Sequence, residues 1–166
     1  MEERQKPPVT FEDGLACGFD DAWHEAWWGY MEATGGNVIA YHRMRIVEDG
    51  DDYQIMEMDY HPGARQGTGV YASGIMMQLA DVAATGVCFG HMRKNAPGGT
   101  TDFPFPLAVQ ISVNLFRNTD HGKIRAEARL THGGRMMMVV DSTVKDEDGR
   151  LLAKVTTTHL VPPQRR

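Results

Sequence analysis

The feature that most constrains the fold is the segment 74–88, in which apolar residues occur on every side of a helix. A surface helix carries apolar residues on one face only, so an all-round pattern indicates a helix buried in the core. One polar stripe interrupts the pattern, made of Gln78, Asp81 and Thr85 at spacings of three and four. The segment therefore predicts a central helix that other elements cover on all sides.

Extended patterns occur on both sides of this helix along the sequence. Before it, two runs at 38–47 and 53–60 flank an Asp-Gly turn, which is typical of a hairpin. A single apolar helix between strands requires a curved sheet around it, and this predicts an α+β domain. Four further runs follow the helix and alternate apolar and polar residues as antiparallel strands do; they cover 109–116, 124–130, 136–145 and 151–160.

A second helical pattern lies near the N-terminus. Asp20 or Asp21 is placed to cap a helix that runs to about Ala33. Its i, i+4 pair, Trp23 and Trp27, gives an apolar stripe that has to lie against another element.

Length and composition limit the class of protein. A chain of 166 residues has the size of one domain, and we expect a loose lead-in over 1–18 and a single domain over 19–166. Acidic residues outnumber basic ones by 22 to 17, the reverse of the balance typical of nucleic-acid binders. The apolar runs are shorter than the roughly 18 residues of a membrane span, and residues 1–8 have no apolar signal-peptide core. Two cysteines, Cys17 and Cys88, make no disulfide framework, which fits a cytoplasmic protein.

Four segments, in their order and spacing, resemble the acyl-CoA thioesterases of the hotdog fold. The nearest group is the phenylacetyl-CoA and hydroxybenzoyl-CoA type, which carries its acid on the central helix. The resemblance implies a long helix wrapped by a curved antiparallel sheet, here with an extra N-terminal helix. It also implies hydrolysis of an acyl-CoA thioester to the free acid and coenzyme A. The matching segments are 66–85, 109–117, the turn Gly133-Gly134-Arg135, and 148–153.

The resemblance assigns chemical roles around the start of the helix. Asp81 stands at the family's acid and would act as general base toward water, or as nucleophile through an anhydride. The family's His-Gly-Gly segment reads Ala72-Ser73-Gly74 here, so the His is lost. The backbone N–H of Ser73 would polarise the thioester carbonyl, because N–H groups at a helix N-terminus are unpaired, and Gly74 would allow close approach.

Two further polar residues fall at positions that the family uses. Gln66, from the same or a facing subunit, would orient the carbonyl or the water, and Thr85 would hydrogen-bond the water or the carboxylate. Some relatives carry a Ser or Thr where this chain has Ala108, so that role is absent or moved.

Structural explanations exist for the same residues. A buried carboxylate such as Asp81 is often paired with a backbone N–H or an Arg, Thr85 can bond its own helix backbone, and Ser73 can act as a helix cap. The Trp-rich helix and the methionines at 76, 77 and 136–138 would either wall an acyl pocket or pack the core.

Coenzyme A carries phosphates, which arginine side chains bind well. Arg117 and Arg135 are the candidates for this contact, with Gly134 forming the family's turn, and His61 is the one histidine that we place near the site. No histidine spacing is that of a metal site, so we expect neither a metal nor a cofactor beyond the coenzyme A thioester itself.

Two other functions compete with thioester hydrolysis. A hydratase or dehydratase needs a His beside the acid to move a proton at carbon, and Ala72 stands in its place. A non-catalytic acyl-CoA sensor stays open because Ala72, Ser73 and Ala108 depart from the family pattern. The edge of such a sheet has to be covered, and the resemblance implies a homodimer or a dimer of dimers whose active sites are shared between subunits.

Overall fold

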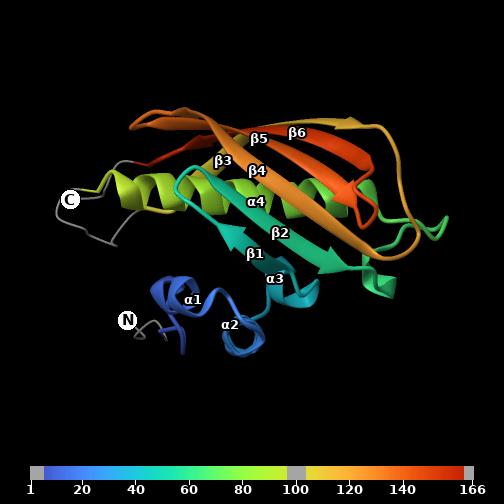
Figure 1. The fold of residues 1–166 in the computed structure, drawn as a ribbon, viewed down its shortest axis with the longest axis horizontal. Helices are drawn as coiled ribbons and strands as arrows, with labels where there is room; N and C mark the ends of the chain where they lie inside the picture. The colour runs from blue at the N-terminus through green and yellow to red at the C-terminus, as the bar shows by residue number, and fades with distance from the viewer. Residues whose placement is uncertain (1–5, 97–103, 163–166) are drawn as a thin grey trace.

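The computed structural model describes residues 6–96 and 104–162 of the chain. Six antiparallel strands form one sheet in the order β1-β2-β4-β5-β6-β3, and the sheet curves around the long helix α4 (Ser73–Lys94) (Figure 1). The α+β prediction is therefore confirmed. The strands are β1 (Arg45–Asp49), β2 (Tyr53–Asp59), β3 (Leu107–Leu115), β4 (Lys123–Gly133), β5 (Met137–Asp146) and β6 (Leu151–Leu160).

Helix α4 is buried because its apolar residues point in every direction, as the sequence predicts. Its inward residues pack against alternate residues of the strands, and in β2 these are Gln54, Met56 and Met58. Gly86 permits the closest of these contacts, since a Cβ built there would lie 2.1 Å from the Gln54 Oε1 atom. The buried residues of α4 are Met76, Leu79, Ala80, Ala83, Ala84, Val87, Cys88 and Gly90.

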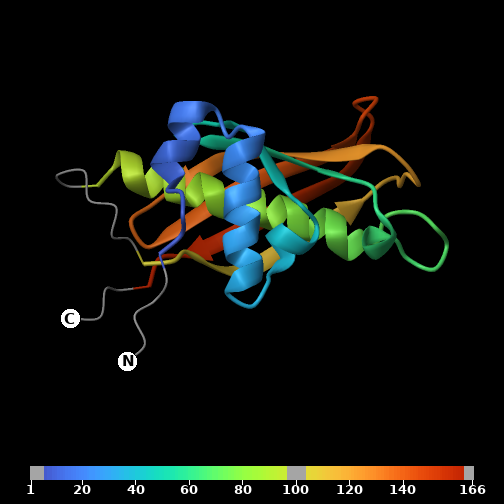
Figure 2. The ribbon, with the colours of Figure 1, turned by 90° about the horizontal axis from the view of Figure 1, so that it is seen from below.

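The N-terminal helices lie on the side of α4 that the sheet leaves open. They are α1 (Phe11–Cys17), α2 (Asp21–Ala33) and α3 (Val38–Tyr41), and α2 crosses over α4 (Figure 2). The Asp20 side chain accepts a hydrogen bond from the Trp23 N–H and caps α2, as the sequence predicts.

Two N-terminal segments differ from the prediction. Residues 11–17 form α1 within the expected loose lead-in, because Thr10 and Asp13 make a reciprocal capping box at its start. Residues 38–41 are helical where an extended run was expected, since the Asn37 side chain accepts hydrogen bonds from the N–H groups of Ile39 and Ala40. Short polar caps thus override the local apolar pattern.

Helix α2 covers one edge of the sheet. The Ile46 N–H of β1 donates to His24 Nε2 at 3.0 Å, so Nδ1 carries the proton and donates to the Asp20 carbonyl at 2.8 Å. The Trp28 Nε1–H donates to the Met44 carbonyl at 3.2 Å. These bonds satisfy backbone groups of an edge strand that would otherwise be open to another chain.

Replacement of His24 is expected to destabilise the fold. His24→Leu removes the acceptor of the Ile46 N–H, and a buried donor without a partner costs about 1–3 kcal/mol of unfolding free energy. Urea unfolding followed by tryptophan fluorescence measures the change. The control Glu25→Ala removes only an exposed ion pair with Arg43, worth at most about 1 kcal/mol. Equal losses in the two variants would contradict the anchoring role of His24.

Candidate active site

A cavity of about 710 Å³ lies between α4 and the N-terminal helices. Apolar side chains make up most of its lining, and the carboxylate of Asp81 is one of few polar groups on its wall. Helix α4 contributes Asp81, Val82, Thr85, Gly86, Phe89 and Arg93. The opposite wall is made by residues of α1 and α2, including Phe11, Trp23, Trp27 and Met31, and the sides by Met44, Ile46, Gln54, Met56 and residues 105–108.

Asp81 is an acid in an environment that disfavours its charge. Its Oδ1 atom is buried and has no hydrogen-bond partner in the described part of the chain. Burial raises the pKa of Asp81 above its ordinary value. No backbone N–H or Arg of the described residues bonds this carboxylate. The alternative in which Asp81 is a structural acid held by such a partner is therefore not supported.

His159 on β6 interacts electrostatically with this acid. The imidazole is fully buried, its Nε2 lies 3.0 Å from Thr157 Oγ1, and its Nδ1 has no partner among the described residues. Burial lowers the pKa of His159, whereas the charge of Asp81 acts to raise it; the same interaction acts to lower the pKa of Asp81. Sequence reasoning did not select His159. The alternation of Val155, Thr157 and His159 toward the core was the available signal.

Thr85 and Ala108 share the cavity wall with Asp81. Thr85 lies one helical turn after Asp81 on the same face of α4, and Ala108 lies opposite at the start of β3. The methionines of the sequence hypothesis are placed elsewhere: Met76 and Met138 are buried in the core, whereas Met77, Met136 and Met137 are exposed.

The start of α4 lies outside this cavity. Ala72 is the N-cap and provides no side-chain hydrogen bond, so Ser73 is the first helical residue and not the cap. The backbone N–H groups of Ser73 and Gly74 have no partner among the described residues. Eight residues separate Ser73 from Asp81, a rise of about 12 Å along the helix. Within one chain, the candidate carbonyl-polarising group and the candidate base are therefore far apart.

Gln66 and His61 belong to the loop that precedes α4. The Gln66 side chain is exposed and its Nε2 donates to Thr68 Oγ1 at 3.1 Å. His61 caps the short helix η1 (Pro62–Ala64), and its Nε2 lies 3.0 Å from Nδ1 of His42. Neither residue lines the Asp81 cavity. Within one chain, the histidines beside this cavity are His24, which lines it, and His159, which interacts with Asp81. A role for His61 stays a prediction.

The two arginines proposed for the coenzyme A phosphates lie at opposite ends of α4. Arg117 is close to the start of the helix, where the neighbouring Asn118 donates to the Tyr71 carbonyl at 2.8 Å. Arg135 follows Gly134 in the turn between β4 and β5, and Gly133 at the start of this turn lies close to His91 near the end of the helix. Both arginines are exposed, and one chain cannot bring them to the same phosphate.

A search of the described residues for other kinds of site gives two results. Among residues 6–96 and 104–162, no group of three or more His, Cys, Asp or Glu side chains is placed to hold a metal ion. Within the same ranges, no helix combines the length and the apolar character needed to span a membrane.

Comparison with known proteins places this arrangement in a family. The model of the thioesterase superfamily matches residues 68–153, just over half of the chain, from the loop before α4 into β6. The chain belongs to the thioesterase superfamily. Its fold is the hotdog fold of solved thioesterases, as the sequence resemblance predicted.

Three relatives illustrate how far this similarity extends. A Mycobacterium tuberculosis protein provisionally named an esterase is 22% identical over 111 residues, which is 67% of this chain and 76% of that protein. Its structure superimposes with a TM-score of 0.69 and 19% identity over 77% of this chain and 98% of that one. A thioesterase from Haemophilus influenzae gives a TM-score of 0.68 at 18% identity, over 80% and 87% of the two chains. A Streptococcus mutans protein solved with bound acetyl-CoA gives 0.63 at 20% identity, over 74% and 91%.

The raised pKa of Asp81 predicts that this acid lowers the stability of the folded thioesterase-superfamily domain at neutral pH. The folded state favours the protonated form of Asp81. The contribution of this residue to the free energy of unfolding is therefore fully present below its ordinary, unfolded-state pKa of about 3.9, and it is lost as pH rises through the raised pKa of the folded state. Asp81→Asn is therefore expected to have a higher melting temperature than wild type at pH 7, with the difference vanishing toward pH 4.

Asp141 provides the matched control for this measurement. Hydrogen bonds from Thr156 and Thr131 lower the pKa of Asp141, so Asp141→Asn is expected to melt at a lower temperature than wild type at pH 7. Differential scanning calorimetry at several pH values measures both variants. A loss of stability in Asp81→Asn at pH 7 would show that the carboxylate is paired in solution.

Proposed function

We propose that the protein hydrolyses acyl-CoA thioesters, with Asp81 as the reacting acid. The observation that carries this proposal is a carboxylate without a hydrogen-bond partner on the wall of a large apolar cavity, in a chain of the thioesterase superfamily. An unpaired buried acid costs stability, and such groups cluster at functional sites. The acetyl-CoA bound to the Streptococcus mutans relative supports a coenzyme A thioester as the ligand.

The chemistry requires three events at the thioester. Water adds to the carbonyl carbon while Asp81 accepts its proton, or the Asp81 carboxylate adds first and water then cleaves the anhydride. The carbonyl oxygen gains negative charge, which unpaired N–H groups at a helix N-terminus stabilise. When water adds directly, the carbon–sulfur bond breaks after the addition; when Asp81 adds first, it breaks as the anhydride forms, before water cleaves that anhydride. In both routes the coenzyme A thiolate leaves and takes up a proton that comes from the water. Thr85, on the same face of α4, is placed to hold the water or the carboxylate.

We further propose that the working unit is a homodimer, paired through the open edge of β3. A β-bulge between Ala108 and Gln110 interrupts the alternation of β3; beyond it, Ile111, Val113 and Leu115 form an apolar stripe on one face, and Leu115 is more than half exposed. Leu107 and Val109, beside the bulge, are also more than half exposed. A second copy placed edge to edge would pair the open strand and cover this stripe. It would also bring the Ser73 N–H and Gln66 of one copy toward Asp81 of the other, which supports a shared site because these groups are about 12 Å or more apart in one chain.

A binding protein without activity is the second candidate. Ala72 and Ala108 favour it, because both are methyl side chains at positions where the sequence resemblance leads us to expect a His and a Ser or Thr. Such a binding protein would use the same cavity and the same acyl-CoA ligand as the hydrolase, and it would differ only in that the thioester is not cleaved.

An assay of thiol release separates these two candidates. Wild type is expected to release coenzyme A from at least one member of a panel of short, medium and aryl acyl-CoAs. Asp81→Asn is expected to lose on the order of 10²-fold or more in kcat/KM, the usual contribution of a general base. Asp141→Asn, a carboxylate on the outer side of the sheet, is the control and keeps its activity. A wild type that is inert on the whole panel, yet is thermally stabilised by acyl-CoA, would establish the binding protein instead.

A charge on the β3 stripe is expected to separate the dimer. Ile111→Lys introduces a cation into the apolar stripe, so the variant should sediment as an 18.5 kDa monomer and lose activity together with dimerisation. Ser112→Lys places the same charge on the other face of β3 and should remain dimeric and active. Analytical ultracentrifugation measures the masses. An Ile111→Lys monomer with full activity would contradict a shared site.

A further inference from the structure

The cavity wall opposite Asp81 is made by a part of the chain outside the matched family segment. The superfamily model begins at residue 68, after all of α1, α2 and α3. The Mycobacterium tuberculosis relative is covered over 98% of its length by only 77% of this chain. All three N-terminal helices thus lie outside the matched segment, and their residues form a wall of the cavity that holds the candidate acid.

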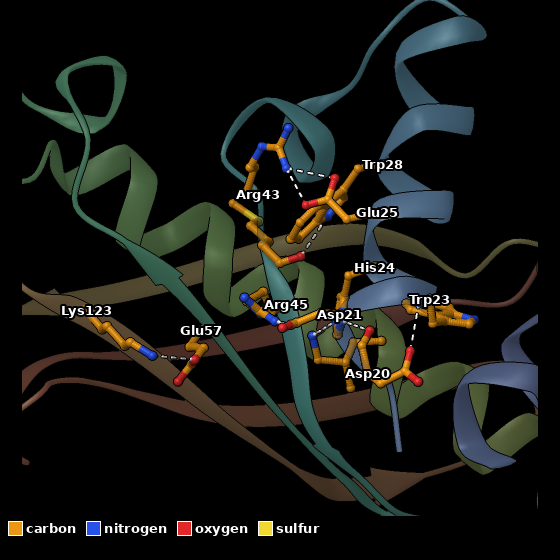
Figure 3. A network of polar contacts seen from close by, with 12 residues as sticks. Asp20, Asp21, Trp23, His24, Glu25, Trp28, Arg43, Arg45, Glu57 and Lys123 are labelled. Atoms are coloured by element: carbon orange, nitrogen blue, oxygen red, sulfur yellow. Dashed lines mark hydrogen bonds and ion pairs between the residues drawn. The ribbon is translucent and has the colours of Figure 1, made fainter. Parts of the chain in front are cut away.

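This wall is fixed in place by polar contacts along α2. His24 bonds the Ile46 N–H of β1, and Trp28 bonds the carbonyl of Met44 just before this strand. Arg43 forms a two-oxygen ion pair with Glu25 at 2.9 and 3.1 Å (Figure 3). Arg45 pairs with Asp21 at the start of the same helix. These contacts hold α2 against the sheet edge. Trp23, Trp27 and Met31 of the same helix line the cavity.

Helix α1 is attached to α2 and lines the far part of the cavity through Phe11 and Glu12. The Trp23 Nε1–H donates to the Thr10 carbonyl at 2.9 Å. The Arg93 guanidinium lies 5.2 Å from the centre of the Phe11 ring, and its Nη2 lies 3.5 Å from Asp49 Oδ2. Twelve residues separate Asp81 from Arg93 on α4, so the cavity lining extends about 18 Å along the helix from the candidate acid to Arg93.

The inner surface of the wall is aromatic. The rings of Trp23 and Trp27 stack at 5.6 Å with an interplanar angle of 8°, and Met31 continues the surface one turn later. Trp23 is held by its bond to Thr10, whereas Trp27 is half-buried and borders the cavity. A flat aromatic side chain and a flexible methionine suit an apolar ligand.

We propose that this chamber receives the acyl group of the substrate, and that Trp27 selects apolar acyl groups much larger than acetyl. The inference rests on the proposed thioester chemistry at Asp81, because it places the carbonyl at Asp81 and the acyl tail along α4 toward Phe11. A cavity of about 710 Å³ lies in the range that holds a drug-sized ligand, and a two-carbon acetyl group leaves most of it unfilled. Each further methylene buried contributes a factor of about four to transition-state binding.

The test compares acyl groups across matched variants. Wild type is expected to prefer octanoyl-CoA over acetyl-CoA by on the order of 10²-fold or more in kcat/KM. Trp27→Ala should lower kcat/KM for octanoyl-CoA by about tenfold or more while changing it for acetyl-CoA by less than about threefold, and Trp27→Phe should restore much of the loss. Phenylacetyl-CoA, run beside octanoyl-CoA, shows whether a ring or a chain fits better.

Tyr41→Ala is the matched control, since Tyr41 is an exposed aromatic residue of α3 that does not line this cavity. It should leave the octanoyl-to-acetyl ratio unchanged. A preference of wild type for acetyl-CoA, or an equal loss for all acyl groups in Trp27→Ala, would overturn the inference.

A binding measurement separates failure of this inference from failure of the proposed function. Calorimetric titration of Asp81→Asn compares octanoyl-CoA with free coenzyme A, without turnover. Suppose that wild type is inactive on every thioester, and that octanoyl-CoA still binds more tightly than free coenzyme A unless Trp27 is replaced. The acyl chamber is then established and the hydrolase activity is not. If thioesters are hydrolysed but Trp27→Ala changes neither the acyl selectivity nor the binding of octanoyl-CoA, the hydrolase is established and the acyl chamber is overturned.

Discussion

The need to cover α4 on every side determines the rest of this structure. A helix with apolar residues all round has to be enclosed, and the curved sheet encloses only part of it. The N-terminal helices cover another part, and their attachment to β1 also satisfies one sheet edge. Two regions stay incompletely covered in the single chain: the cavity beside Asp81 and the apolar stripe of β3. The proposed chemistry and the proposed dimer both follow from these two regions.

The same enclosure gives Asp81 its character. A carboxylate in a mostly apolar wall has a raised pKa, and His159 opposes that shift only through an electrostatic interaction. A base with a raised pKa is stronger once ionised, so the instability of the buried charge and its proposed reactivity have one cause. A functional residue that lowers the stability of the fold is common in enzymes. Here the apolar packing of the rest of α4 offsets the cost of burying the Asp81 charge.

Much of the fold was readable from the sequence, because periodicity reports burial directly. The all-round pattern of 74–88 predicted the enclosed helix, and the extended run at 53–60 predicted the strand that is β2. The errors arose at α1 and α3, where the Thr10 and Asn37 caps decide the local structure and periodicity carries no information. Caps of this kind depend on single side chains and are easily missed in a short segment.

The candidate site was less predictable, because it depends on distances between elements. Sequence reasoning placed Asp81 and Thr85 together correctly, since helical spacing fixes them on one face. It could not tell that Arg117 and Arg135 lie near opposite ends of α4, and it passed over His159, whose interaction with Asp81 arises only when β6 packs on the helix.

The central claim is that the ionised Asp81 carboxylate, with a pKa raised by burial, performs the reaction. Difference infrared spectroscopy of wild type against Asp81→Asn isolates the carboxyl band of this residue, and its titration can be set beside the pH dependence of kcat/KM. The account predicts a midpoint above the ordinary value of about 3.9 that coincides with the acidic limb of the rate profile. A carboxyl that titrates at its ordinary value, or a rate profile with a different midpoint, would contradict it.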